Sequence, residues 1–371
     1  MARRTISAQS APFDLNKFQS VHQVGGIRTG TIDDPTPGGG NRGCRVAHVN
    51  TGSGLRFTVA LDRGGDIVEA FYNQHSLAFL TPNGYKLPSH AYHQGLDWLV
   101  GWPGGLVTTC GPRYIGGPRQ ENGEQVSLHG YHSNTPAAVE MVLNPDPQFG
   151  RNEMLLSMVI TDSRMFGPIV EVRRQIQCRL GVSEIVIFDQ VTNRGDQPVP
   201  HNWLYHVNLG YPLLDEGARL IFAGKLFGTW DTDPNQAGAK VNAGKLKRVP
   251  AGLPEHAGAG ERGIILDPRS DREGLAHAGL INPRLKLGVE LIFPTDALPR
   301  LANWQHYGPT GSYVVGIEPF SGSLTGKAND KHPTADQWLE PGQSKRYHLT
   351  IRVHSDPAAL KALAAMDGPV K

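Results

Sequence analysis

The sequence has little cysteine, no long apolar run and almost no excess of charge, and each shortage excludes a class of protein. Its 371 residues include three cysteines, Cys44, Cys110 and Cys178, which are too few and too far apart for a disulfide scaffold or a CxxC metal knuckle. No apolar stretch approaches the roughly 20 residues of a membrane span. The 36 Lys and Arg residues are nearly balanced by 34 Asp and Glu residues, so the sequence lacks the basic excess of a nucleic-acid-binding surface. We therefore expect no nucleic-acid partner and no membrane association.

The N-terminal residues also lack the pattern of a secretory signal. Arg3 and Arg4 are basic, but no apolar stretch follows them. Scattered cysteines are typical of a reducing compartment. We expect a soluble, cytoplasmic protein whose oligomeric state the sequence leaves open.

Glycine and proline, by contrast, are abundant, at 45 and 28 residues. They are scattered along the chain, which indicates many turns between short segments. Apolar residues alternate with polar ones at 55–61, 172–180, 285–293 and 347–353, the period of a strand with one buried face. A helical period is scarce, except where Asp356 can cap a helix that begins at Pro357. The sequence predicts an all-β protein, a large antiparallel β-sandwich with a short C-terminal helix.

Two Gly/Pro-rich stretches, at 34–43 and 231–262, are candidate domain boundaries. Both are short enough to be long loops of one sandwich. We predict a single domain over 1–371, with an N-terminal arm at 1–20 and a helical tail at 355–371.

Neither a cofactor nor a metal ion is expected. Two stretches fit GxGxxG, at 38–43 and 258–263, but neither has the preceding strand and following helix that a dinucleotide site needs. The 15 histidines include no HExxH. Nearby histidine pairs are three or five residues apart, which on a strand directs the two side chains to opposite faces.

The densest polar chemistry lies at residues 97–137. Trp98 and Trp102 offer flat apolar faces on which a sugar ring can stack, and Arg113 and His129 can bond hydroxyl groups. The alternative is an ordinary long hairpin with tryptophans in the core. The first interpretation makes all four residues candidates for binding a substrate.

Two later segments add acid–base groups. His206 and Asn208 lie on one side of a strand-like run at 201–212, and Asn208 is a further candidate for substrate binding. Glu318 ends an apolar strand at 313–319. A carboxylate in such a place is costly unless it is paired or functional.

The blocks GWPGGLVTTCG, LHGYHSNTPA, LYHVNLGYPLLD and GIEP together resemble the aldose 1-epimerase-related proteins of the DUF4432 type, in the galactose mutarotase-like superfamily. The likeness runs from DRGGDI at 62–67 to LEPGQSKRYHLTIRV at 339–353. It implies a galactose mutarotase-like supersandwich that binds carbohydrate.

The resemblance also implies roles for individual residues. In aldose 1-epimerases a glutamate takes the proton of the anomeric hydroxyl while a histidine protonates the ring oxygen. By motif, Glu318 is the base, His206 the acid and His129 a sugar contact. Arg113 falls near the substrate-binding arginine of the family, and Arg63 in DRGGDI is a second basic candidate.

One departure concerns the acid. In better-known mutarotases the histidine stands four residues before the asparagine, whereas His206 stands two before Asn208. His201 is therefore a fallback. We expect His129, His206 and Glu318 to meet in an open cleft.

We thus expect an enzyme, a sugar isomerase that interconverts anomers as an aldose 1-epimerase does, acting on a small-molecule sugar or sugar derivative. Two alternatives stay open: a non-catalytic carbohydrate-binding or sensing protein, and another sugar enzyme such as a lyase or an epimerase at a different carbon. Hydrolysis by retention needs two carboxylates, and only Glu318 stands out.

Overall fold

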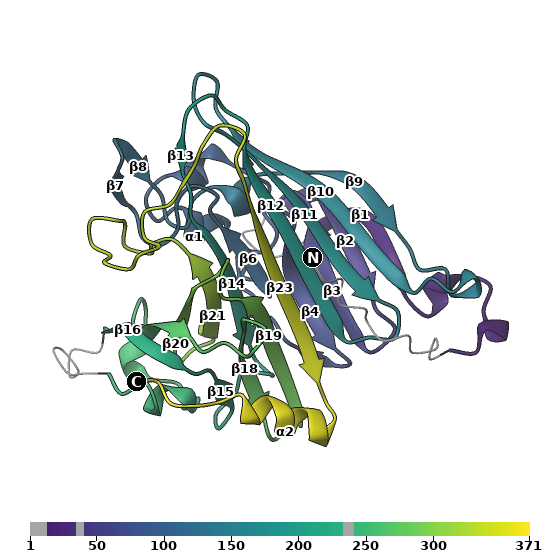
Figure 1. Ribbon diagram of the computed structural model, residues 1–371. Coiled ribbons are helices and arrows are strands. Elements are labelled where there is room, and N and C mark those ends of the chain that lie inside the picture. Colours follow the sequence, from purple (N-terminus) through teal and green to yellow (C-terminus); the bar gives the residue numbers. More distant parts are fainter. Residues whose placement is uncertain (1–12, 35–40, 233–240) are drawn as a thin grey trace.

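A computed structural model describes residues 13–34, 41–232 and 241–371. Within these ranges most strands belong to two large antiparallel sheets that pack face to face (Figure 1). The larger has 11 strands, which lie side by side in the order β1 (Gly26–Asp34), β2 (Asn41–Asn50), β3 (Leu55–Ala60), β4 (Asp66–Tyr72), β6 (Val107–Cys110), β14 (Trp203–Gly210), β21 (Tyr313–Ser321), β20 (Arg300–Tyr307), β17 (Arg262–Pro268) and β16 (Gly224–Asp231), with β5 (His75–Ser76) on β4.

The second large sheet, among the same described residues, has 8 strands. Their order is β15 (Arg219–Ile221), β18 (Leu275–Asn282), β19 (Leu287–Pro294), β23 (Ser344–His354), β12 (Glu184–Asn193), β11 (Ile169–Arg179), β10 (Glu153–Ser163) and β9 (Ala137–Leu143). Two short pairs join β7 (Arg119–Glu121) to β8 (Glu124–Val126) and β13 (Val199–Pro200) to β22 (Trp338–Leu339). The predicted antiparallel β-sandwich is confirmed.

The period-two pattern explains the core. In β11 the buried side chains are those of Val170, Val172, Arg174, Ile176 and Cys178, and the residues between them are exposed or half-buried. One cluster of buried apolar side chains draws on both large sheets. The strands β3, β11, β19 and β23 confirm the four segments that alternation predicted. That the chain forms a single domain stays a prediction, and residues 1–12 of the expected arm lie outside the described residues.

The C-terminal helix is also confirmed. In α2 (Pro357–Ala365) the Asp356 carboxylate accepts hydrogen bonds from the backbone N–H groups of Ala358 and Ala359, as a capping residue does. Leu363 packs on Ile221 and Ile281 at the end of the smaller sheet. The one-turn helix α1 (Trp98–Gly101) was not expected. Across the described ranges, no helix combines the length and apolar character that crossing a membrane requires.

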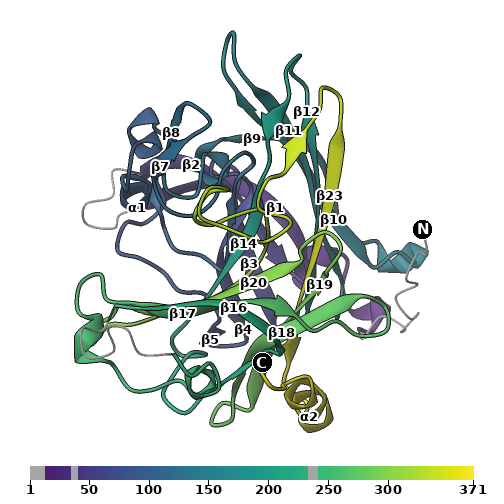
Figure 2. The same ribbon diagram turned by 60° about the vertical axis from the view of Figure 1, so that its left-hand side comes forward.

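The central strands of the larger sheet are buried on both faces. All residues of β14 are buried. Trp203, Tyr205 and Val207 face the main core, whereas Leu204 belongs to a second apolar cluster on the opposite face. Figures 1 and 2 place α1, β7 and β8 on the side of β14 away from β10, β11 and β12. A polar side chain on that outer face of β14 is therefore shielded from water by the loops around α1.

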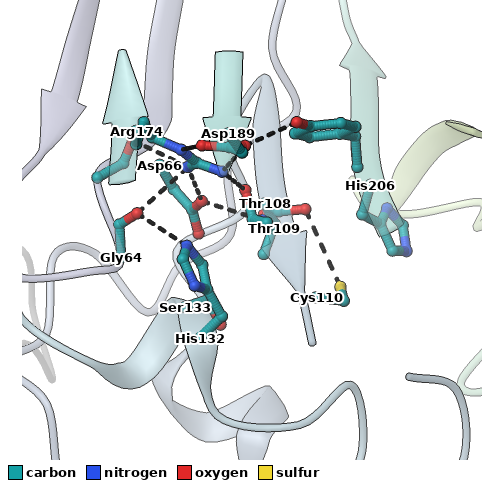
Figure 3. Close-up of polar contacts among 12 residues, drawn as sticks. Gly64, Asp66, Thr108, Thr109, Cys110, His132, Ser133, Arg174, Asp189 and His206 are labelled. Atoms are coloured by element: carbon teal, nitrogen blue, oxygen red, sulfur yellow. Dashed lines mark hydrogen bonds and ion pairs between the residues drawn. The ribbon is translucent and has the colours of Figure 1, made fainter. Parts of the chain in front are cut away.

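A buried guanidinium joins the two large sheets. Arg174 of β11 donates to both carboxylate oxygens of Asp189, at 2.8 Å each. It also donates to Thr109 Oγ1 at 2.8 Å and to Asp66 Oδ1 at 3.2 Å, both on the larger sheet. Figure 3 shows this network, with the His206 ring directed away from it. Tyr205 completes it by donating to Asp189 at 2.7 Å.

Asp189→Asn should destabilise the fold strongly, because it leaves the Arg174 charge without its main counter-charge in the core. We expect a loss of about 3–5 kcal/mol in the free energy of unfolding. Glu140→Gln is the matched control, since Glu140 pairs with the exposed Arg173 at 3.0 Å and such pairs contribute at most about 1 kcal/mol. Chemical denaturation measures both, and equal losses would contradict the role given to the buried pair.

Candidate functional site

Glu318 and His206 lie on adjacent strands and face the same side. The register of β14 against β21 pairs Leu204 with Phe320 and Asn208 with Gly316, which sets His206 level with Glu318. His206 Nε2 and Glu318 Oε1 are 3.3 Å apart, without the alignment of a hydrogen bond. Side-chain alternation in the two strands therefore brings an acid–base pair together from residues far apart in the sequence.

Gly316 keeps the space beside this pair open. It lies opposite Asn208 on one side and Trp304 on the other. A Cβ at Gly316 would be 2.2 Å from Glu318 Oε1 and 3.2 Å from His206 Cε1. Any side chain here would have to displace the catalytic candidates.

His129 approaches His206 from a loop on the outer face. Its ring centroid is 5.4 Å from that of His206, with the rings perpendicular. The His129 backbone is left-handed, at a φ of 58°, which is uncommon for a residue with a side chain. Hydrogen bonds to Gly116 and from Gly111 hold this conformation. Such strain is often found where a side chain must be aimed at a functional site.

Three indole rings surround the two histidines. The ring centroids of Trp98 and His129 are 4.9 Å apart, and those of Trp102 and His206 are 6.0 Å apart. Trp304 meets His206 at 5.5 Å, nearly edge-on. Trp98 is fixed by donation to Ser133 at 3.0 Å, and Trp102 by donation to Thr108 at 2.9 Å. The indoles are thus held at fixed positions.

The site is nearly enclosed. Glu318 is 4% exposed and His206 6% exposed, so the expected open cleft is replaced by a covered site. Burial, with a smaller contribution from the charge of Glu261, raises the pKa of Glu318 well above its usual value. Burial also lowers the pKa of His206 to about 4. Both shifts favour the uncharged forms, a protonated carboxyl group and a neutral imidazole.

Three buried polar atoms of this group have no hydrogen-bond partner among the described residues. They are Glu318 Oε1, His206 Nδ1 and His129 Nδ1. Buried polar atoms are nearly always satisfied, so each exception needs an explanation. A ligand rich in hydroxyl groups would supply the missing partners.

The structure therefore brings together five of the candidates from the sequence: Glu318, His206, His129, Trp98 and Trp102. Asn208 is adjacent: its amide N–H group donates to the backbone carbonyls of Gly105 and His206. Its Oδ1 is buried without a partner among the described residues, so its role in substrate binding stays a prediction. No group of three metal-binding side chains is found in the ranges that the structure covers.

The two arginine candidates have other contacts. Arg113 donates to both oxygens of Glu124 at 2.8 Å and lies 3.8 Å from Asp162. Arg63 donates to Asn134 at 2.7 Å. In the part of the chain that the structure describes, neither arginine forms a hydrogen bond or ion pair with Glu318 or His206. A basic residue in the expected motif does not fix where its long side chain ends.

His201, the fallback acid, is a core residue. Its two ring nitrogens lie 2.8 Å from the Pro112 carbonyl and 2.6 Å from the Tyr347 hydroxyl. It is fully buried and both nitrogens have partners. Geometry thus favours His206 as the histidine beside Glu318.

Sequence reasoning missed two members of this group, Trp304 and Glu261. The Glu261 carboxylate accepts from the indole N–H groups of Trp304 at 2.6 Å and Trp230 at 3.1 Å. Trp304 could have been found by strand alternation, because it lies on the same face of β20 as Ala302, the partner of Glu318. Glu261 lies in a glycine-rich loop whose sequence carries no such signal.

Comparison with solved structures shows the fold. A candidate aldose 1-epimerase of Klebsiella pneumoniae superposes with a TM-score of 0.79 at 22% identity, covering 93% of this chain and 88% of that one. A galactose mutarotase-like protein of Clostridium acetobutylicum gives a TM-score of 0.57 at 13% identity, covering 89% and 99%.

A candidate aldose 1-epimerase of Escherichia coli K12 gives a TM-score of 0.55 at 14% identity, covering 89% and 99%. No curated protein matches the sequence significantly. The galactose mutarotase-like sandwich expected from the sequence is thus confirmed. Residues 41–353 match the family described as Domain of unknown function (DUF4432), and the chain belongs to that family.

Proposed function

We propose that this protein is a sugar isomerase that interconverts the anomers of an aldose or a modified aldose. The observation that carries the proposal is the buried pair of Glu318 and His206. Its polar atoms lack partners among the described residues, and indole rings pack beside it. Indole faces stack on sugar C–H groups, and the unsatisfied atoms can bond hydroxyl groups. The names of the structural neighbours agree with this chemistry.

Anomer exchange needs one group that accepts a proton and another that donates one. Glu318 takes the proton of the anomeric hydroxyl, and His206 gives a proton to the ring oxygen, which breaks the bond between that oxygen and C1. The carbonyl group of the open sugar then rotates, and the reverse transfers close the ring on its other face. Protons are conserved, so neither a cofactor nor a metal ion takes part in this scheme.

The two groups share one proton. The raised pKa of Glu318 and the lowered pKa of His206 favour the form in which Glu318 carries this proton. Glu318 Oε1 and His206 Nε2 are 3.3 Å apart, so a small rotation of one side chain would align them as a hydrogen bond. Passage of the proton along that bond creates the carboxylate base and the imidazolium acid. His206 Nδ1 has no partner among the described residues, so it is the nitrogen available to donate to the ring oxygen.

Glu318→Gln should abolish most anomer exchange and leave sugar binding largely intact. Glutamine keeps the shape but cannot accept the proton, so we expect kcat to fall about 100-fold or more. His206→Asn should behave alike, and the double variant should be scarcely worse than either single one. Polarimetry or NMR on freshly dissolved anomers measures the rate against buffer alone.

His201→Asn is the matched control for the histidine. It should lower the melting temperature, since His201 is bonded at both nitrogens, but leave kcat of the folded protein close to the wild-type value. Wild-type protein that binds aldoses and never exceeds the buffer rate would overturn the proposal. A dehydrated, absorbing product would then indicate a lyase, and binding alone a carbohydrate sensor.

Glu318→Gln should also stabilise the protein measured without added sugar, and this gain in stability should increase as the pH rises. The folded-state pKa of Glu318 lies above its unfolded value. Ionisation therefore costs folding free energy as the pH rises from the unfolded pKa through the folded one. Glutamine removes this cost. Melting temperatures of the wild type and the variant between pH 4 and pH 9 test this prediction. A difference between the two melting temperatures that does not change with pH would contradict the burial of an ionisable Glu318.

A further inference from the structure

Glu261 is held in place by hydrogen bonds to both of its carboxylate oxygens. Its Oε1 accepts from Trp230 Nε1 at 3.1 Å and its Oε2 from Trp304 Nε1 at 2.6 Å. Within the described ranges, no lysine or arginine lies at ion-pair distance from it. The two oxygens of one carboxylate thus fix two indole rings without neutralising the charge.

The backbone around Glu261 is shaped for this contact. Its N–H donates to Thr232 Oγ1 at 2.6 Å, and its carbonyl accepts from Thr232 N at 2.9 Å. Gly263, opposite Trp230 in the β16–β17 pairing, has no side chain. A Cβ there would lie 2.3 Å from the Trp230 ring. The Trp230 indole can occupy this place because residue 263 is glycine.

One of the two indoles touches the proposed acid. The ring centroid of Trp304 is 5.5 Å from that of His206, with an interplanar angle of 75°. Trp304 also lies opposite Gly316, the residue that leaves space beside Glu318. With its N–H bonded to Glu261, the Trp304 ring cannot turn away from His206 without losing a hydrogen bond.

The charge of Glu261 is a second link between this residue and the Glu318–His206 pair. The ionisable groups that face Glu318 are His206 of β14, Cys110 of β6 and Glu261 before β17, with His129 beyond His206. After burial, the negative charge of Glu261 is the remaining cause that raises the pKa of Glu318. A nearby like charge disfavours a second ionised carboxylate.

We propose that Glu261 is a positioning residue of this site, which holds Trp304 edge-on against His206 and places a negative charge beside the Glu318–His206 pair. Its catalytic consequence rests on the proposed isomerase function. A purely structural role would predict a loss of stability alone, so the test uses properties of the site.

The first experiment needs no sugar. Glu261→Gln keeps one acceptor oxygen and removes the charge, and Glu255→Gln removes an exposed charge from the neighbouring loop as the control. Carboxyl 13C NMR follows the titration of Glu318, and 1H–15N NMR follows the indole N–H groups. We expect Glu261→Gln alone to move the titration of Glu318 to lower pH and to shift the Trp304 indole signal. Unchanged titration and indole signals would overturn the proposal.

The second experiment measures catalysis. Glu261→Gln and Trp304→Phe should each lower kcat about tenfold with a smaller change in KM, because a misplaced reacting group affects the rate more than binding. The double variant should lose little more than either single variant. Trp230→Phe, which removes the donor farther from His206, should have a smaller effect on kcat.

The two hypotheses fail in different ways. Wild-type protein without activity on any sugar would overturn the isomerase function, while the NMR titration still decides the position of Glu261. An active wild type whose kcat and pH profile are the same after Glu261→Gln would overturn only the positioning role. Should Glu261→Gln fail to fold, Trp304→Phe tests the same contact from the other side.

Discussion

The buried ion pair between Arg174 and Asp189 is the interaction on which the alignment of the two sheets depends. An arginine in the core is tolerated only where carboxylates and other acceptors surround it. Here the acceptors come from both sheets, with Asp189 on one and Asp66 and Thr109 on the other. The network therefore restrains how β6 and β14 lie over β11 and β12. Hydrogen bonds depend on direction as well as distance, so they restrain this alignment more than apolar contacts do.

The same strands carry the site on their other face. Thr109 binds Arg174, and its neighbour Thr108 holds the Trp102 indole. Tyr205 donates to Asp189, and its neighbour is His206. Because successive side chains of a strand point to opposite faces, each core contact restrains the adjacent outward side chain. The inter-sheet network thus restrains the geometry of the site from behind.

Local patterns in the sequence predicted much of the fold, and motifs predicted the central pair. Alternation located β3, β11, β19 and β23, and the blocks around His206 and Glu318 named residues that the register of β14 and β21 brings together. Arg63 and Arg113 show the limit. A long side chain ends where tertiary partners such as Glu124 or Asn134 hold it, and these partners are not visible in a local pattern.

Glu261 shows a second limit, since its proximity to Glu318 depends on how β17 and β20 are placed in the larger sheet. Burial explains how the acid–base pair can be stable in the core. Two opposite charges buried without full hydrogen bonding cost several kcal/mol, whereas a neutral carboxyl group beside a neutral imidazole costs less. The raised pKa of Glu318 and the lowered pKa of His206 favour this neutral form. In the proposed function, a bound sugar would supply hydroxyl groups to the unsatisfied atoms. In the proposed mechanism this bonding stabilises the charged form, so charge separation occurs only when there is a substrate to use it.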